Sequence, residues 1–358
     1  MNWKEQIISR LQGQGSGDRS LYVPDLSLWY EWHEKQGSLP REWQGASLPA
    51  ICRAMGVPIW LPFQPWRLET PGVETVTSET EGERAIRWQT EAGSLVSRWT
   101  LGPAGDWWQV EYPVKGAEDL PAALEWVQAR SYALHEEGLV EARAEVGSDG
   151  VVALTLPRRP YSDLLHEVLG WAEGLLLLND PAVQEMLADL EEKLQALAAE
   201  VARLPGKVVL SPDNLDGQYI SPRMYQRHLA ASYQQTAEQF AAQGKCLVVH
   251  AGGPVRRLLE PLAEAGVAAV EGIAGAPQSD ATLAEARQAA GPDLTLWGGI
   301  AQDLMLEAHD WPAFEAAVRQ AAAEAKEDPR AILGVADRVP VPAELDRLRA
   351  IAEWAAEA

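Results

Sequence analysis

His250 is the residue whose place in the sequence most directly suggests chemistry. It ends the apolar run Cys246–Val249 and precedes Ala251-Gly252-Gly253, where a backbone without side chains lets a ligand approach closely. An imidazole titrates near neutral pH, so it can serve as a general acid, a general base or a metal ligand. Cys246 lies on the same strand face but about 13 Å away, at roughly 3.3 Å per residue. The two side chains therefore cannot chelate one metal.

A second concentration of polar side chains follows the run Lys207–Leu210. Asp213, Asn214 and Asp216 lie there within four positions. As catalytic groups, the two aspartates would stabilise positive charge or exchange protons. As structural groups, all three are typical turn-forming residues ahead of a helix. The sequence leaves both interpretations open.

Other candidates follow the remaining predicted strands and would bind substrate rather than react. The arginines among them are more typical of solvated surface charges than of ligand contacts. Tyr161 is added as a catalytic candidate. The predicted binding residues are Asp25, Trp29, Tyr30, His33, Trp66, Arg158, Asn214, Gln218, Asp337 and Arg338.

The elements that must position these residues alternate between strand and helix from about residue 150. Short β-branched runs each precede a helical stretch, which predicts a parallel sheet with helices outside it. The Ser221-Pro222 pair is a strong helix start, because serine caps the helix and proline fits its first turn. The predicted strands are Val151–Leu156, Lys207–Leu210, Cys246–Val249, Val267–Val270, Leu294–Trp297 and Ala331–Leu333.

Two further strands are predicted upstream, at Leu21–Val23 and Val57–Leu61. They complete the eight strands of a (β/α)8 TIM barrel, in which active sites lie at the carboxyl ends of the strands. The segment at about 70–115 breaks the alternation and reads as an antiparallel meander punctuated by glycines. We therefore expect one α/β domain over residues 1–358, with a β insertion in its N-terminal third.

Composition excludes several function classes. The chain carries 30 basic and 52 acidic residues, a net charge of −22, which repels nucleic acid and anionic lipid. Its two cysteines cannot form a disulfide framework, and the apolar runs are too short to span a membrane. We expect a cytoplasmic protein that binds neither nucleic acid nor membrane. The many tryptophans near the N-terminus, such as Trp29 and Trp66, either line an aromatic-ligand pocket or fill the core.

The chain resembles the uroporphyrinogen decarboxylase superfamily of TIM barrels, which also contains corrinoid-linked methyltransferases. The resemblance is carried by an ordered set of segments rather than by any single motif, and it covers roughly the last 150 residues. The segments are 213–225 (DNLDGQYISPRMY), 244–253 (GKCLVVHAGG), 258–267 (LLEPLAEAGV), 296–300 (LWGGI), 332–334 (ILG) and 341–344 (VPAE).

The resemblance also locates departures from both branches. The methyltransferase branch binds zinc with a His-x-Cys pair and a later cysteine; here His250 keeps the histidine, but Gly252 occupies the cysteine position. The decarboxylases carry substrate-binding arginines after the first strand, whereas the segment 25–33 contains none. Tyr161 is the nearest match to a tyrosine of the decarboxylases. The chain is thus expected to be a divergent member.

Three functions follow as hypotheses. The first is a decarboxylase-like lyase that acts without a cofactor on a carboxylated, possibly tetrapyrrole, substrate, with His250 as acid and a homodimer as in the decarboxylases. The second is methyl transfer with a corrinoid protein, using a divalent metal on His250 with Asp216, Glu271 or Asp337. The third is a non-catalytic barrel that binds a tetrapyrrole or another aromatic ligand.

Overall fold

The β-branched runs form one seven-stranded parallel sheet in the computed structural model, which describes residues 1–15, 20–102 and 107–357. The strands follow one another across the sheet in chain order, as strand–helix–strand connections dictate. All seven strands predicted inside this sheet are confirmed, although several run further than expected. They are β1 (Ile59–Phe63), β8 (Gly150–Thr155), β9 (Val208–Leu215), β10 (Cys246–Ala251), β11 (Ala269–Ile273), β12 (Thr295–Ile300) and β13 (Ala331–Val335).

The predicted strand Leu21–Val23 is present as a single parallel bridge between Tyr22 and Leu333 of β13. The N–H of Val23 donates to the carbonyl of Leu333 at 2.9 Å, and the N–H of Leu333 donates to Leu21. The eight predicted strands therefore correspond, in the described residues, to seven strands and one bridge at the β13 edge.

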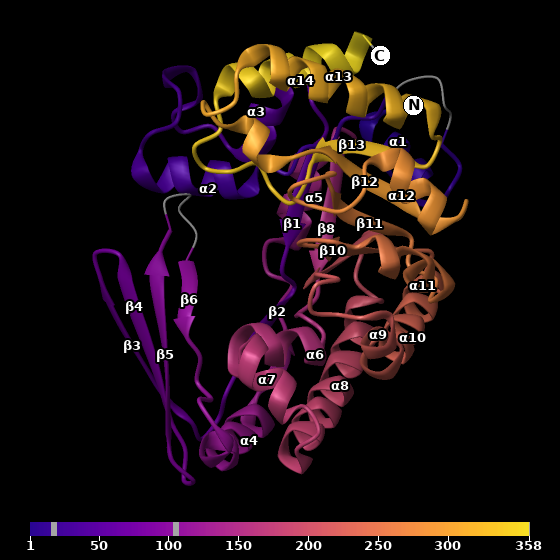
Figure 1. The fold of residues 1–358 in the computed structure, drawn as a ribbon. Coiled ribbons are helices and arrows are strands. Elements are labelled where there is room, and N and C mark those ends of the chain that lie inside the picture. Colours follow the sequence, from indigo (N-terminus) through magenta and orange to yellow (C-terminus); the bar gives the residue numbers. More distant parts are fainter. Residues whose placement is uncertain (16–19, 103–106, 358) are drawn as a thin grey trace. The chain divides into compact units, whose positions relative to one another are not determined.

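Contacts divide the chain into two units. The first comprises Met1–Gln64, Glu136–Leu156 and Ala202–Ala358 and contains the parallel sheet; the second comprises Pro65–His135 and Pro157–Val201. Figure 1 labels the elements of each.

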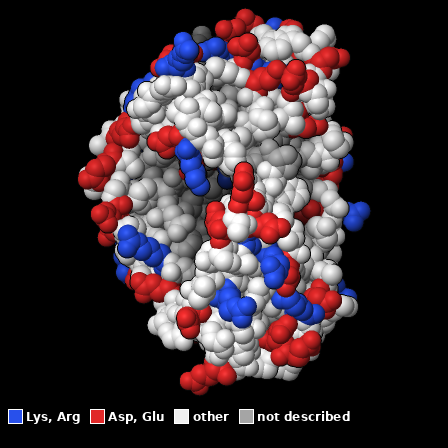
Figure 2. All heavy atoms as spheres, turned by 90° about the vertical axis from the view of Figure 1, so that its left-hand side faces the viewer, with Lys and Arg blue, Asp and Glu red and all other residues white. Residues whose placement is uncertain are grey.

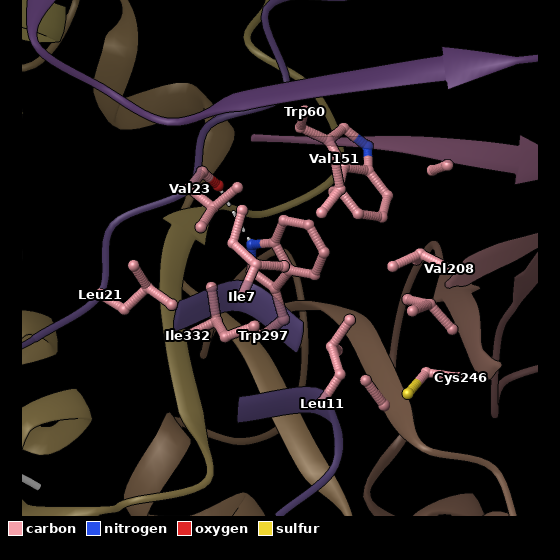
Figure 3. Close-up of a cluster of buried hydrophobic side chains, with 13 residues drawn as sticks. Ile7, Leu11, Leu21, Val23, Trp60, Val151, Val208, Cys246, Trp297 and Ile332 are labelled. Carbon is pink, nitrogen blue, oxygen red and sulfur yellow. Dashed lines mark hydrogen bonds between the residues drawn. The ribbon is translucent and has the colours of Figure 1, made fainter. Parts of the chain in front are cut away.

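The parallel sheet of the first unit curls around an apolar interior. Trp60 of β1 and Trp297 of β12 meet edge to face with ring centroids 4.6 Å apart, although their strands lie near opposite edges of the sheet. The indole N–H of Trp297 donates to the carbonyl of Val23 at 3.2 Å (Figure 3). Alternate residues of the strands fill the same space, among them Val208 and Cys246. This layer lies in the N-terminal halves of the strands.

Helix α1 (Trp3–Leu11) covers that layer. Its apolar face inserts Ile7 and Leu11 into the interior cluster, as Figure 3 shows. The backbone carbonyl of Arg10 accepts a hydrogen bond from the Thr295 hydroxyl at 2.9 Å, which fixes the helix to β12. The N-terminal end of the sheet is thus filled with side chains.

Helices pack on the outer face of the sheet: α10 (Ala230–Ala241) contacts β10, and α13 (Trp311–Glu327) contacts β12 and β13 (Figure 1). The predicted start at Ser221 is confirmed, since its hydroxyl accepts from the N–H of Met224. The helices of this unit other than α1 are α2 (Ser27–Gln36), α3 (Leu48–Met55), α5 (Leu139–Val146), α9 (Pro222–His228), α10 (Ala230–Ala241), α11 (Leu259–Glu264), α12 (Leu283–Ala290), α13 (Trp311–Glu327) and α14 (Leu345–Glu357).

The second unit contains the predicted meander. Four antiparallel strands, β3 (Glu74–Thr80), β4 (Glu83–Gln89), β5 (Ser94–Leu101) and β6 (Trp107–Glu111), pair in sequence order. The unit also holds the short pair β2 (Trp66–Glu69) and β7 (Ser131–Leu134), so it extends beyond the expected insertion. Its helices include α4 (Leu120–Ala129), α6 (Pro160–Asp163), α7 (Trp171–Leu177) and α8 (Pro181–Val201).

The molecular surface carries both signs of charge. On the face drawn in Figure 2, acidic and basic side chains are interspersed among uncharged ones. Among the described residues, no helix combines the length and the hydrophobicity needed to cross a lipid bilayer.

Candidate active site

His250 and Glu271 form a buried pair on neighbouring strands. The register of β10 and β11 places His250 directly beside Glu271. Two residues earlier on each strand, Val248 and Ala269 belong to the apolar interior, so alternation turns the imidazole and the carboxylate to the same side. Nδ1 of His250 lies 2.6 Å from Oε2 of Glu271, and the two side chains are 15% and 12% exposed.

Irregular backbone surrounds this pair. The register between β9 and β10 shifts between Val249 and Ala251. The register between β11 and β12 shifts between Glu271 and Ile273. Such bulges redirect side chains and are common beside active sites. They occur here at the carboxyl ends of the strands, where barrel enzymes hold their catalytic groups.

The second oxygen of Glu271 is also engaged. Oε1 accepts the backbone N–H of Asp337 at 2.9 Å, just after β13 ends. Asp337 has φ of 66°, a left-handed conformation that aspartate tolerates better than most residues. Oδ1 of Asp337 lies 3.8 Å from Nε2 of His250. The imidazole is therefore oriented by Glu271 at one nitrogen and faces Asp337 with the other.

The charges of the pair are coupled. Burial alone would lower the pKa of His250, but Glu271 and Asp337 outweigh it and raise the pKa to about 9. Burial raises the pKa of Glu271 to about 7, against the lowering effect of His250. We conclude that the imidazole is held protonated at neutral pH, since it has two carboxylates within reach. The imidazolium is thus an acid that is largely shielded from water.

Two further predicted residues adjoin this pair. Burial raises the pKa of Asp25, whose carboxylate accepts the N–H and hydroxyl of Ser27 at 2.9 and 2.6 Å. The backbone carbonyl of Asp25 accepts the N–H of Val339 at 2.9 Å, which ties it to the segment after β13. The guanidinium of Arg338 lies 3.5 Å from Asp337 and is 43% exposed. Negative charge thus exceeds positive charge around the imidazole.

Two glutamines fix the segment that carries Asp337 and Arg338. The Gln302 amide donates to the carbonyl of Arg338 at 2.7 Å, and its backbone N–H donates to the side chain of Gln278. Gln278 donates in turn to the carbonyl of Ala336. This network holds the left-handed turn in place.

Asn214 and Asp216 lie against the glycines that follow His250. Asn214 has φ of 52°, and a Cβ on Gly252 would lie 1.6 Å from its Oδ1. Asp216 lies against Gly253 in the same way and accepts the N–H of the exposed Gln218. Burial raises the pKa of Asp216. Glycine is thus required after His250 because these side chains occupy the space.

Asp213 does not join them. Its carboxylate accepts the hydroxyl of Ser211 at 2.7 Å and that of Tyr233, on α10, at 2.6 Å. Strand β9 runs on to Leu215, so alternation turns Asp213 outward into the layer between sheet and helix. The expected convergence of Asp213 with His250 is therefore wrong, and the residue is a buried structural group.

Three aromatic residues of the first unit that were predicted to bind substrate also have structural roles. Trp29 is buried and packs edge to face against Trp43 with centroids 6.2 Å apart. The Tyr30 hydroxyl donates to the carbonyl of Ala46 at 3.2 Å. Nε2 of His33 donates to the carbonyl of Val341 at 3.0 Å. These side chains anchor α2 instead of presenting an open stacking surface.

The remaining candidates belong to the second unit. Trp66 meets Tyr132 of β7 edge to face with centroids 5.3 Å apart. Arg158 forms an ion pair with Glu167. Tyr161 is buried in α6, and burial raises its pKa above the ordinary value.

A divalent metal does not fit the donors around His250. Nδ1 of His250 is taken by Glu271, which leaves Nε2 and Oδ1 of Asp337 as two protein donors, whereas a catalytic zinc site uses three protein ligands and a water. Within the described ranges, no three His, Cys, Asp or Glu side chains are grouped to hold a metal. Asp216, which was also predicted as a metal ligand, lies against Gly253 and accepts the backbone N–H of Gln218.

The sequence alone gives little indication of the place of Glu271. This glutamate entered only as an alternative metal ligand, whereas the structure makes it the partner that orients His250. The available signal was its position two residues after a buried alanine, on the strand that follows the histidine strand. Converting that signal into a pair required the register between the strands, which one sequence does not contain.

Comparison with known proteins adds information on the fold. No family model matches the chain, and no curated protein matches it in sequence. A solved methyltransferase from Methanosarcina mazei is similar over 100% of this chain and 99% of its own, with a TM-score of 0.64 and 14% identity. A D-psicose 3-epimerase from Clostridium cellulolyticum H10 covers 62% of this chain and 82% of its own, with a TM-score of 0.38 and 10% identity. The first likeness shows that the two chains share a fold.

Proposed function

We propose that this chain is an enzyme in which the His250 imidazolium donates a proton to an electron-rich carbon of a carboxylated substrate, which then loses CO2. The observation that carries the proposal is the buried His250–Glu271 pair, 2.6 Å apart at the carboxyl ends of adjacent strands. The proposal includes a fully closed eight-stranded barrel, with Leu21–Val23 as the eighth strand.

His250 suits the role of acid because its raised pKa keeps the imidazole protonated and because its orientation fixes the direction of the Nε2 proton. Glu271 binds Nδ1, so the remaining proton on Nε2 faces the side occupied by Asp337. A buried acid transfers its proton without first reorganising solvent. A general acid of this kind contributes about 10²–10⁴-fold to a rate.

The surrounding carboxylates favour reactions in which the substrate becomes positive. Protonation of an electron-rich ring creates a cation, and Asp25 and Asp337 would stabilise it. The bond from the side-chain carbon to its carboxylate then breaks, its electron pair enters the cationic ring, and CO2 leaves. The freed carbon takes up a proton and the ring returns one, so the reaction consumes one proton overall. This chemistry needs no cofactor because the protonated ring accepts the electrons.

Arg338 is the proposed contact for the substrate's carboxylates. It lies one residue after Asp337 and is 43% exposed, so its guanidinium can bind a carboxylate in two parallel hydrogen bonds. Its ion pair with Asp337, at 3.5 Å, would rearrange when substrate binds.

The test is incubation of the chain with uroporphyrinogen under reducing conditions, with chromatographic detection of less carboxylated products. We expect turnover by the wild type and its loss in His250→Gln. His309→Gln is a matched control, since His309 also faces a carboxylate, Asp303 at 3.2 Å, but at a more exposed position. A product pattern that is identical in both variants contradicts the proposal, as does binding of the substrate without turnover.

A second candidate function is methyl transfer with a corrinoid protein. The full-length likeness to the M. mazei methyltransferase favours it. In this case the imidazolium would protonate the group that leaves the methyl carbon. The spectrum of cob(I)alamin changes on methylation, so the absorbance of a corrinoid mixed with the chain and a methyl donor separates this function from decarboxylation.

A further inference from the structure

A cavity at the N-terminal end of the parallel sheet is lined by three cationic residues. It has a volume of about 350 Å³ and lies where α1, the end of α5 and the start of β9 meet. Lys4, Arg143 and Lys207 line it, together with apolar residues that include Val151. It lies within the first unit, at the end of the sheet opposite to His250.

Within the described ranges, the three cations have no acidic partner. None of them has a carboxylate at ion-pair distance in the part of the chain that the structure describes. Two acidic residues that follow Arg143 in the sequence interact elsewhere: Glu145 accepts from Ser47, and Asp149 pairs with Arg53 at 2.6 Å. In a chain of net charge −22, three unpaired cations around one cavity require a reason.

A fourth cation, Lys245, lies near the cavity and binds the backbone of one of its walls. Lys245 is buried, and its ammonium donates to the carbonyl of Gly206 at 2.7 Å and to that of Leu204. Burial lowers the pKa of Lys245, and Lys207 and Arg143 lower it further. Lys245 thereby fixes the loop that forms one wall of the cavity, while its own charge adds to the potential there.

We propose that this cavity binds a small organic molecule through a phosphate group. A phosphate dianion matches several cationic residues that line one cavity better than a single carboxylate does, and a guanidinium can contact two of its oxygens. The apolar part of the wall, which includes Ile8 and Val151, would cover the rest of the molecule. The volume is at the lower end of the range for small-ligand sites, about 300–1,000 Å³.

The site is separate from the proposed active site. The layer that contains Trp60, Trp297 and Val208 fills the interior between the two ends of the sheet. A molecule in the cavity would therefore bind without competing with substrate. The proposal does not depend on the reaction assigned to His250.

Isothermal titration of the full chain with phenyl phosphate and pyrophosphate tests the proposal. We expect binding of phenyl phosphate by the wild type, and at least tenfold weaker binding by Arg143→Glu/Lys207→Glu. Lys35→Glu/Lys326→Glu is the matched control, because it changes the net charge equally at two exposed positions away from the cavity. Added salt should weaken binding, since exposed charges are screened. Circular dichroism checks that each variant is folded.

Citrate serves as the carboxylate probe. Weaker binding of citrate than of pyrophosphate supports the assignment to phosphate, and tighter binding of citrate overturns it. Equal affinities of the two charge-reversal variants for phenyl phosphate overturn the site itself. The absence of binding of both phosphate probes at millimolar concentration does the same.

Discussion

The two ends of the parallel sheet carry opposite charges. At the carboxyl end, Glu271 and Asp337 face one imidazole, and Asp25 adds its charge near Glu271. At the amino end, Lys4, Arg143 and Lys207 line a cavity, and none of them has a carboxylate partner among the residues that the structure describes. Net charge is therefore a poor guide to local sites: a chain of −22 provides both an acid held by carboxylates and a cationic cavity.

The ends also differ in how firmly they hold their charges. His250 is 15% exposed and fixed by strand register and by the hydrogen bonds of Glu271. Arg143 and Lys207 are exposed and have long, flexible side chains. Interactions in a buried environment are stronger than those in water. We therefore expect large effects from substitutions at the carboxyl end and smaller ones at the amino end.

The largest expected effect comes from His250→Gln. Loss of the acid should lower kcat by about 10²–10⁴-fold. His309→Gln should stay within about twofold of the wild type, because surface substitutions rarely exceed about 0.5 kcal/mol. Steady-state kinetics on both variants measures this. A rate for His250→Gln near that of the control would show that the carboxyl end is not catalytic.

Glu271→Gln should cause the next largest effect, and it should depend on pH. Removal of the carboxylate removes a cause of the raised pKa of His250, so the imidazole loses its proton at lower pH. Activity that needs the imidazolium should persist in the wild type up to about pH 9 and decline at lower pH in the variant. Rate against pH for both proteins tests this, and superimposable profiles would exclude Glu271 as the positioning residue.

The sequence predicted the strands well, because each is a short β-branched run between helical stretches. It also singled out His250 as a candidate, because the histidine ends an apolar run ahead of two glycines. It misplaced Asp213, because β9 continues to Leu215 instead of ending at Leu210. Asp213 therefore lies within the strand, with its side chain on the outer face, and not in the loop after the strand. The sequence did not reveal the role of Glu271 or the left-handed turn at Asp337, since both depend on contacts between strands far apart in the chain.

Asp213→Asn should affect stability instead of turnover. The substitution weakens hydrogen bonds to Ser211 and Tyr233 in a buried layer, at a cost of about 1–3 kcal/mol. Urea denaturation measures the loss, and Tyr233→Phe should reproduce part of it. A KM for Asp213→Asn that changes tenfold while stability is retained would instead return the residue to the active site.

The coupled pair should also make stability depend on pH. Both folded pKa values are raised, His250 to about 9 and Glu271 to about 7, so both groups bind protons more strongly in the folded state. Their contribution is present at low pH and is lost as pH rises, for His250 between about 6.5 and 9. The difference in unfolding free energy between the wild type and His250→Gln/Glu271→Gln should be larger at pH 6 than at pH 9.5. A difference that grows with pH would reverse the assignment.

The smallest effect is expected at the amino end. Arg143→Glu/Lys207→Glu should leave kcat and KM within about twofold of the wild type when no phosphate compound is present, because both residues are exposed and lie at the end of the sheet away from His250. A tenfold change in kcat would mean that the two ends are coupled through the apolar layer.

The pKa of the His250 side chain is the decisive measurement for a protonated imidazole at the carboxyl end of the sheet. The chain contains six histidines, so nuclear magnetic resonance titration of the wild type beside His250→Gln identifies the signal that belongs to this residue. We expect this imidazole to remain protonated above pH 8 and to lose its proton near pH 9. A midpoint at or below about 6.5, the value of an unperturbed histidine, would contradict this expectation.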